Sequence, residues 1–144
     1  MSGEPIRWVL DASVGIKLVV FEDDTEKAET LIQNALAPNG PAIYVPDIFF
    51  AECSNVLWKY TRKTGQSVQA AKAQLSDLSA LPLQTIPTPP LMMEAFDTAL
   101  KMEISAYDAL YVVLASTVGG VLVTADRKLA SKIRGSKITV DLVL

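Results

Sequence analysis

Two aspartates stand at or just beyond the ends of apolar runs, where a carboxylate can do chemistry. Asp11 follows Trp8-Val9-Leu10. Asp126 lies two residues after Thr124, which ends a second apolar run. Each aspartate could serve simply as a helix N-cap or a turn residue, because aspartate is common at both. If both runs are strands of one parallel sheet, their carboxyl ends meet at the same edge, and we expect the two carboxylates to emerge there together.

Glu52 falls inside a predicted helix, on the face that we expect to point inward. Its neighbours at three and four positions are Ile48, Phe49, Asn55 and Val56. Most of these are apolar, so this side of the helix faces the core. A buried, ionised carboxylate is costly without a cation beside it. We therefore expect Glu52 either to pair with an arginine or lysine or to hold a metal ion.

Asp108 shows a similar ambiguity. It lies three residues after Ser105, which fits a helix-capping pattern, and an acid is favourable near a helix N-terminus. On the same helical face lie Ile104, Tyr111 and Val112, which we expect to pack inward. We expect most other aromatic residues of the predicted helices to serve packing as well. A capping position and a ligand position are compatible, so both interpretations stay open.

The sequence contains no histidine and a single cysteine, Cys53, which we expect to be a small buried apolar residue. Without histidine, Ser-His-Asp and Cys-His mechanisms and histidine metal ligands are excluded. A single cysteine excludes an internal disulfide and a Cys-rich zinc site. If the protein is an enzyme, we expect its chemistry to rest on carboxylates, with a hard cation such as Mg²⁺ or Mn²⁺ as a candidate cofactor. Four such acids favour phosphodiester hydrolysis by a metal-activated water, with the metal also orienting the scissile phosphate.

Composition sets the remaining bounds. The 144 residues suit one domain, residues 1–144, and half of them are hydrophobic, which is typical of a globular protein. The net charge of -3 gives no overall basic field for coating nucleic acid, although an acidic metal site itself lowers the net charge. No apolar run approaches the roughly 20 residues that cross a bilayer, and the first residues do not resemble a signal peptide. We therefore expect a cytoplasmic protein with no membrane partner.

The elements that must position the acids alternate along the chain. We predict strands at residues 8–10, 42–45, 83–86, 121–124 and 137–140, and helices at 25–36, 47–60, 67–78, 90–100, 105–116 and 128–133. Strands that alternate with helices imply a parallel sheet covered on both faces. Ligands of such sheets bind at the carboxyl ends of the strands. The sequence therefore predicts an α/β fold with the acids at that edge.

Four blocks of sequence, taken together, resemble the PIN domain family, and within it the VapC toxins of toxin–antitoxin pairs. They occur in the family's order and spacing over nearly the whole chain. The blocks are Val9-Leu10-Asp11-Ala12-Ser13, Val45-Pro46-Asp47 with the following Glu52 and Asn55-Val56-Leu57, Ser105-Ala106-Tyr107-Asp108-Ala109-Leu110-Tyr111, and Leu122-Val123-Thr124-Ala125-Asp126-Arg127-Lys128-Leu129. One block alone would carry little weight, whereas the four in order are specific.

The resemblance implies a PIN-like three-layer α/β/α sandwich with a short parallel sheet and an acidic groove. It gives catalytic and metal-ligand roles, toward Mg²⁺ or Mn²⁺, to four residues: Asp11, Glu52, Asp108 and Asp126. Ser13 and Thr124 match hydroxyl positions that orient ligands or water from a second layer. Capping or a strand-end hydrogen bond would account for these two hydroxyls equally well.

The resemblance also implies an endoribonuclease that acts on RNA. VapC-like proteins form homodimers and are blocked by a VapB-type antitoxin, whose C-terminal tail enters the groove. Basic residues surround the last acid, and phosphate contacts from them would hold RNA. Among these, Arg127 is our candidate for a contact with substrate or antitoxin, although each such residue would also suit an ordinary solvated surface.

Three other functions remain open at this point. The first is a PIN nuclease that is not a toxin and acts in RNA processing with the same chemistry. The second is a PIN-like scaffold that binds partners without cutting RNA, which we would expect to have lost one of the acids. The third is an unrelated α/β phosphatase or receiver-like domain, which we would expect to carry paired acids near its first strand. Here the second and third acids fall inside helices instead.

Overall fold

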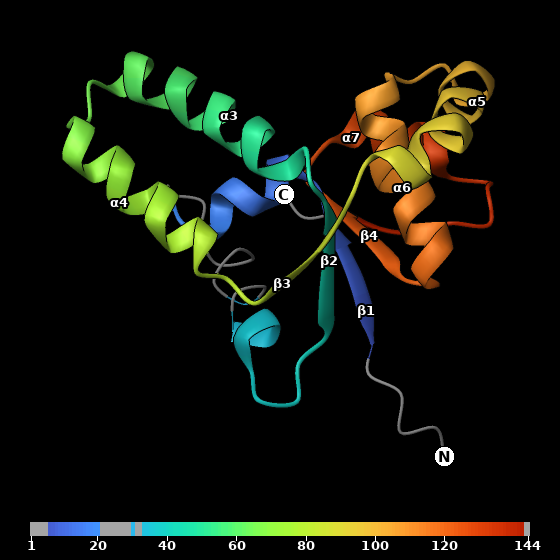
Figure 1. The fold of residues 1–144 in the computed structure, drawn as a ribbon, viewed down its shortest axis with the longest axis horizontal. Coiled ribbons are helices and arrows are strands. Elements are labelled where there is room, and N and C mark those ends of the chain that lie inside the picture. Colours follow the sequence, from blue (N-terminus) through green and yellow to red (C-terminus); the bar gives the residue numbers. More distant parts are fainter. Residues whose placement is uncertain (1–5, 21–29, 31–32, 143–144) are drawn as a thin grey trace.

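The computed structural model describes residues 6–20, 30 and 33–142, which form a parallel sheet between two layers of helices (Figure 1). The helices and strands follow one another in the order β1 (Arg7–Leu10), α1 (Ala12–Gly15), η1 (Ile16–Leu18), β2 (Ala42–Pro46), α3 (Phe49–Thr64), α4 (Val68–Ser79), β3 (Leu83–Ile86), η2 (Pro89–Leu91), α5 (Met92–Met102), α6 (Ala106–Val118), β4 (Val121–Thr124), α7 (Arg127–Ile133) and β5 (Thr139–Leu142). The predicted α/β/α arrangement is confirmed.

The strand order in the sheet is β3-β2-β1-β4-β5, and all neighbours are parallel. From β1 the chain winds outward to β2 and β3, with α1, α3 and α4 on one side of the sheet (Figure 1). It then returns to β4 and winds the other way to β5, with α5, α6 and α7 on the opposite side. The winding therefore reverses between β1 and β4, and a crevice at the carboxyl ends of such a strand pair is where open α/β sheets bind ligands.

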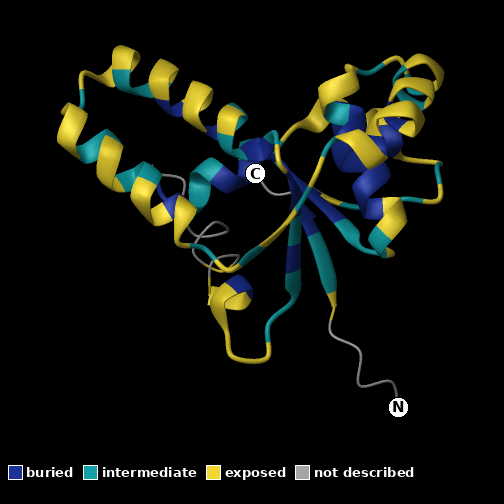
Figure 2. Ribbon diagram, viewed as in Figure 1, coloured by how far each residue is buried: buried dark blue, intermediate teal, exposed yellow. Residues whose placement is uncertain are grey.

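The centre of the molecule is built from β1, β4 and α6. Val9, Leu10, Leu122 and Val123 are fully buried, as expected for strands covered on both faces. Every residue of α6 from position 109 to 115 is buried, and Figure 2 shows this helix as the buried element of its layer. Helix α6 contacts β1, β2 and β4 and is covered on its outer side by α5. This packing fixes the ends of β1 and β4 relative to the first turn of α6.

The predicted elements are largely confirmed, with differences at their ends. Helix α3 continues past the expected end at residue 60 and runs to Thr64. Gly65 ends it as a C-cap in the left-handed backbone conformation, with a φ of 72°. The helix expected from residue 90 begins with the 3₁₀ turn η2, and the last strand begins at Thr139. Of the helix expected at 25–36, residues 25–29 and 31–32 lie outside the described part, and 33–36 are helical. No helix in the described ranges is both long and apolar enough to span a bilayer.

Candidate active site

Asp11 is the most buried of the four acids, with 6% of its surface exposed. Its backbone N–H donates to the carbonyl of Val123 (3.3 Å), which ties the end of β1 to β4. Its carboxylate accepts hydrogen bonds from the Ser13 and Thr124 hydroxyls and from the Val14 N–H (3.2 Å). Asp11 is therefore the N-cap of α1, as the simpler interpretation held, and at the same time a carboxylate held rigidly in place by three donors.

The hydroxyls of Ser13 and Thr124 link Asp11 to the turn that carries Asp126. Ser13 Oγ accepts from the Ala125 N–H (3.0 Å), and Thr124 Oγ1 accepts from the Asp126 N–H (3.0 Å). Each hydroxyl donates its own proton to Asp11. Because each hydroxyl has one proton, it is oriented between a backbone donor and the carboxylate. The two side chains thereby fix the carboxylate relative to the β4–α7 turn.

Asp108 and Asp126 line one hollow of about 170 Å³, together with Ser105, Lys128 and Lys132 among others. Asp126 is exposed and is the N-cap of α7, where its carboxylate accepts from the Leu129 N–H (3.1 Å). Asp108 is half-buried in the first turn of α6, and its N–H donates to the N-cap Ser105 (3.0 Å). The expected N-caps at Ser105 and Asp126 are present. The helix starts that they form place Asp108 and Asp126 beside the same hollow.

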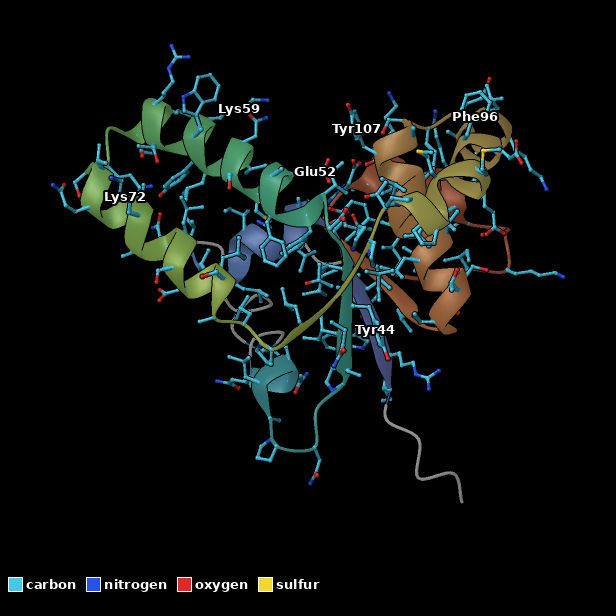
Figure 3. The ribbon with its side chains drawn as sticks, in the orientation of Figure 1. Tyr44, Glu52, Lys59, Lys72, Phe96 and Tyr107 are labelled. Atoms are coloured by element: carbon cyan, nitrogen blue, oxygen red, sulfur yellow. The ribbon has the colours of Figure 1, made fainter. Side chains whose placement is uncertain are left out.

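Glu52 lies at the start of α3, where this helix leaves the sheet edge, with Tyr107 at the start of α6 across from it (Figure 3). Its carboxylate accepts a hydrogen bond from the Tyr111 hydroxyl (2.6 Å). In the described part of the chain no lysine or arginine pairs with Glu52. Tyr111 is buried as expected. Its hydrogen bond to Glu52 was not predicted, although its place one helical turn after Asp108, on the same face, was a signal for a polar role.

The four acids influence one another electrostatically. Burial raises the pKa of Asp11, Glu52 and Asp108 above their ordinary values. The negative charge of Asp108 raises the pKa of Asp11 and Glu52 further, and Asp126 does the same to Asp108. Among the described residues no cation counteracts these effects, and the lowering contributions there come from hydrogen bonds. The edge of the sheet therefore holds concentrated negative charge that a divalent cation would stabilise.

The donor set suits Mg²⁺ or Mn²⁺, although it is not a closed cage. Within residues 6–20, 30 and 33–142, no three acidic or cysteine side chains are arranged to enclose a metal ion. Mg²⁺ usually keeps several of its waters and takes only one or two carboxylates directly, with substrate phosphate completing its shell. Oxygen ligands and uncompensated charge fit this mode of binding, in which other acids act through water.

Two further residues were singled out by sequence. Arg127 is exposed at the start of α7, whereas Lys128 and Lys132 line the hollow beside Asp108 and Asp126. Cys53 is fully buried, and burial raises the pKa of its thiol to about 12, so the thiolate is absent at neutral pH. The expectation that Cys53 serves packing is confirmed.

Replacing Tyr111 with phenylalanine should lower the free energy of unfolding by about 1 kcal/mol at neutral pH, because Glu52 loses its hydrogen-bond donor. The hydrogen bond from Tyr111 lowers the pKa of Glu52, so its loss should raise that pKa and shrink the destabilisation in acid. Urea denaturation at two pH values measures both effects. The control is Tyr107→Phe, which changes an exposed tyrosine on the same helix. If the two variants are equally stable, the hydrogen bond from Tyr111 to Glu52 does not stabilise the folded protein.

Without metal, the protein should become more stable as the pH falls from neutrality toward the ordinary aspartate value of 3.8. Asp11 and Asp108 have raised pKa values when folded, so the folded chain binds protons that the unfolded chain releases. This stabilisation is complete below the unfolded pKa and disappears as the pH rises through the folded one. Urea denaturation in EDTA across this window should show the trend, and Asp108→Asn should flatten it. If the stability of Asp108→Asn depends on pH as steeply as that of the native chain, Asp108 is not one of the groups with a raised pKa.

The model of the PIN domain family matches residues 8–134. Ribonuclease VapC3 of Pyrobaculum aerophilum is 34% identical over 131 residues, covering 88% of this chain and 95% of the relative. The crystal structure of PAE2754 from the same organism has a TM-score of 0.68 at 26% identity, covering 95% of this chain and 84% of that one. A chain in the crystal structure of VapBC2 from Rickettsia felis, bound to a DNA fragment from their promoter, has a TM-score of 0.66 at 15% identity. The match covers 96% of this chain and 100% of that one.

Proposed function

Because this chain belongs to the PIN domain family, we propose that it is a metal-dependent endoribonuclease whose catalytic residues are Asp11, Glu52, Asp108 and Asp126. The observation that carries the proposal is the electrostatic coupling of these acids. They come from separate elements near the carboxyl edge of the sheet, and no described cation is among the groups that shift the pKa values of Asp11, Glu52 and Asp108. The relative named as a ribonuclease supports RNA as the substrate class.

Asp11 is the best fixed ligand for Mg²⁺ or Mn²⁺, because three donors hold its carboxylate. Asp108, Asp126 and Glu52 would complete the site directly or through water. When bound, a divalent ion supplies positive charge for the scissile phosphate and the leaving oxygen and lowers the pKa of a water. Glu52 keeps one oxygen on Tyr111, and no described residue donates to the other, which can accept a hydrogen bond from water.

The same proposal includes a toxin–antitoxin role and a homodimer. The relative named VapC3 and the sequence blocks that resemble VapC toxins support a VapC-like toxin, for which we propose a VapB-type antitoxin as partner. A surface for a second copy is available on α5, where Met92, Met93, Phe96 and Leu100 are between 56% and 79% exposed. Light scattering should give twice the monomer mass for the native chain and the monomer mass for Phe96→Asp.

Expression of the chain alone should arrest growth, whereas Asp108→Asn should not.

The nuclease assignment is tested by incubating total cellular RNA with purified, antitoxin-free protein in Mg²⁺, in Mn²⁺ and in EDTA. Discrete fragments should appear with either metal and disappear in EDTA and in Asp108→Asn. The exposed Asp77→Asn on α4, which removes one acid far from the sheet edge, should cut like the native chain. Fragments that persist in EDTA, or in the Asp108→Asn protein, would contradict the proposal.

A further inference from the structure

A second and larger groove lies beside the acidic hollow. It has a volume of about 650 Å³ and is lined by α5, α6, the last turn of α7 and the segment between α7 and β5. Its charged lining residues are Lys101, Lys132, Arg134 and Lys137, with Glu94 and Glu103. All four basic side chains belong to exposed residues, so their charged groups are open to a ligand in the groove. Hydroxyl groups of Thr98, Ser116 and Ser136 add further hydrogen-bond donors.

The groove joins the hollow that holds Asp108 and Asp126. Glu103 and Lys132 line both spaces and therefore form the boundary between them. The Lys132 ammonium donates to the Glu103 carbonyl (2.5 Å) at the end of α5, where Glu103 adopts a φ of 56°. A cation is thus fixed at the point where a chain leaving the acidic hollow would enter the groove.

The charge of the groove is opposite to that of the protein as a whole. Four cations face two acids in its lining, whereas the chain carries a net charge of -3. The floor also contains apolar side chains, including Met102, Val112 and Ile138. A strand of RNA presents one negative charge per phosphate together with riboses and bases that have apolar faces. The lining complements both parts of such a strand.

We propose that this groove binds the phosphate backbone of single-stranded RNA on one side of the scissile bond, with Lys101, Arg134 and Lys137 as phosphate contacts and Lys132 at the junction. The inference rests on the proposed function and extends it to the path of the substrate. RNA is favoured over an acidic peptide because the groove opens into the hollow where a phosphodiester must sit beside Asp108 and Asp126. A continuous polymer that has one phosphate in the hollow reaches the groove with the next nucleotides.

Binding of a fluorescently labelled single-stranded RNA, measured by anisotropy at several salt concentrations, tests the proposal. All proteins carry Asp108→Asn, so the RNA stays intact. Lys101→Gln and Lys137→Gln should each weaken binding several-fold, and each should reduce the salt slope by about 0.7, the value for one lost phosphate contact on a single strand. Lys72→Gln removes the same charge from α4, on the arm away from α5 (Figure 3), and should leave both quantities unchanged.

The outcomes separate this inference from the proposed function. Equal affinity and salt slope in Lys101→Gln, Lys137→Gln and Lys72→Gln would overturn the groove as the RNA path, even if the native protein cuts RNA. In a protein with Asp108 intact, the two groove variants should raise KM and leave kcat nearly unchanged, because they contact the substrate away from the reacting phosphate. A native protein that neither binds nor cuts RNA would overturn both proposals. Unfolding in urea confirms that each variant is folded.

Discussion

Replacing Asp11 with asparagine should reduce the rate of RNA cleavage by about 100-fold or more while the protein stays folded. Asparagine has nearly the same shape and keeps one oxygen that can accept from the donors around Asp11. It cannot carry the charge that attracts a divalent ion. Stability without metal should change little or increase, because the substitution removes a buried charge that is repelled by Asp108. Cleavage under single-turnover conditions and urea denaturation measure the two effects.

Asp77→Asn is the matched control for Asp11→Asn, since it makes the same chemical change on an exposed part of α4. It should retain native cleavage. Equal rates for Asp11→Asn and the native chain, at equal metal and with both proteins folded, would show that Asp11 is only the N-cap of α1. A loss of activity accompanied by unfolding would be distinguished by the denaturation curve.

Replacing Thr124 with valine should weaken metal affinity or cleavage by about 10- to 100-fold, although this residue is not expected to contact the substrate. Valine fills the same space at this fully buried position but lacks the hydroxyl. Asp11 then loses one donor, and the Asp126 N–H loses its acceptor. Both acids lose their shared orientation. A rise in the metal concentration needed for half-maximal cleavage would be the signature of this positioning role.

Two variants show whether the hydroxyl of Thr124 is responsible. Thr124→Ser restores the hydroxyl and should recover most of the activity. Thr117→Val makes the same change on α6, where the hydroxyl donates only to the Val113 carbonyl, and should have no effect on cleavage. If Thr124→Val needs no more metal than the native chain, the link between the hydroxyl and Asp11 has no part in the reaction.

Local sequence was sufficient to predict the ends of β1 and β4. Both are short apolar runs followed by an aspartate, and a parallel sheet has only one carboxyl edge at which they can end. The N-cap at Ser105 was equally predictable, because the pattern that forms it lies within four residues. The fold class followed from the alternation of strands and helices alone.

Contacts between distant elements could not be predicted in the same way. An ion pair was one expectation for Glu52, but its partner is the Tyr111 hydroxyl of α6. This pairing depends on where the fold places the start of α3 relative to α6, which no local sequence pattern specifies. The basic groove is assembled from α5, α6, α7 and the segment after α7, so no local sequence pattern predicts it. The contact of Arg127 with substrate or antitoxin stays a prediction, and the basic residues among those that line the hollow are Lys128 and Lys132.

Titration of Mn²⁺ into the purified, metal-free protein, followed by isothermal calorimetry and by thermal unfolding, tests most directly whether the four acids form one metal site. The native chain should bind the ion and unfold at a higher temperature when it is present, because binding to the folded state alone stabilises it. Asp11→Asn and Asp108→Asn should lose both responses, and Asp77→Asn should keep them. Equal binding and equal stabilisation in all four proteins would contradict a metal site built on these acids.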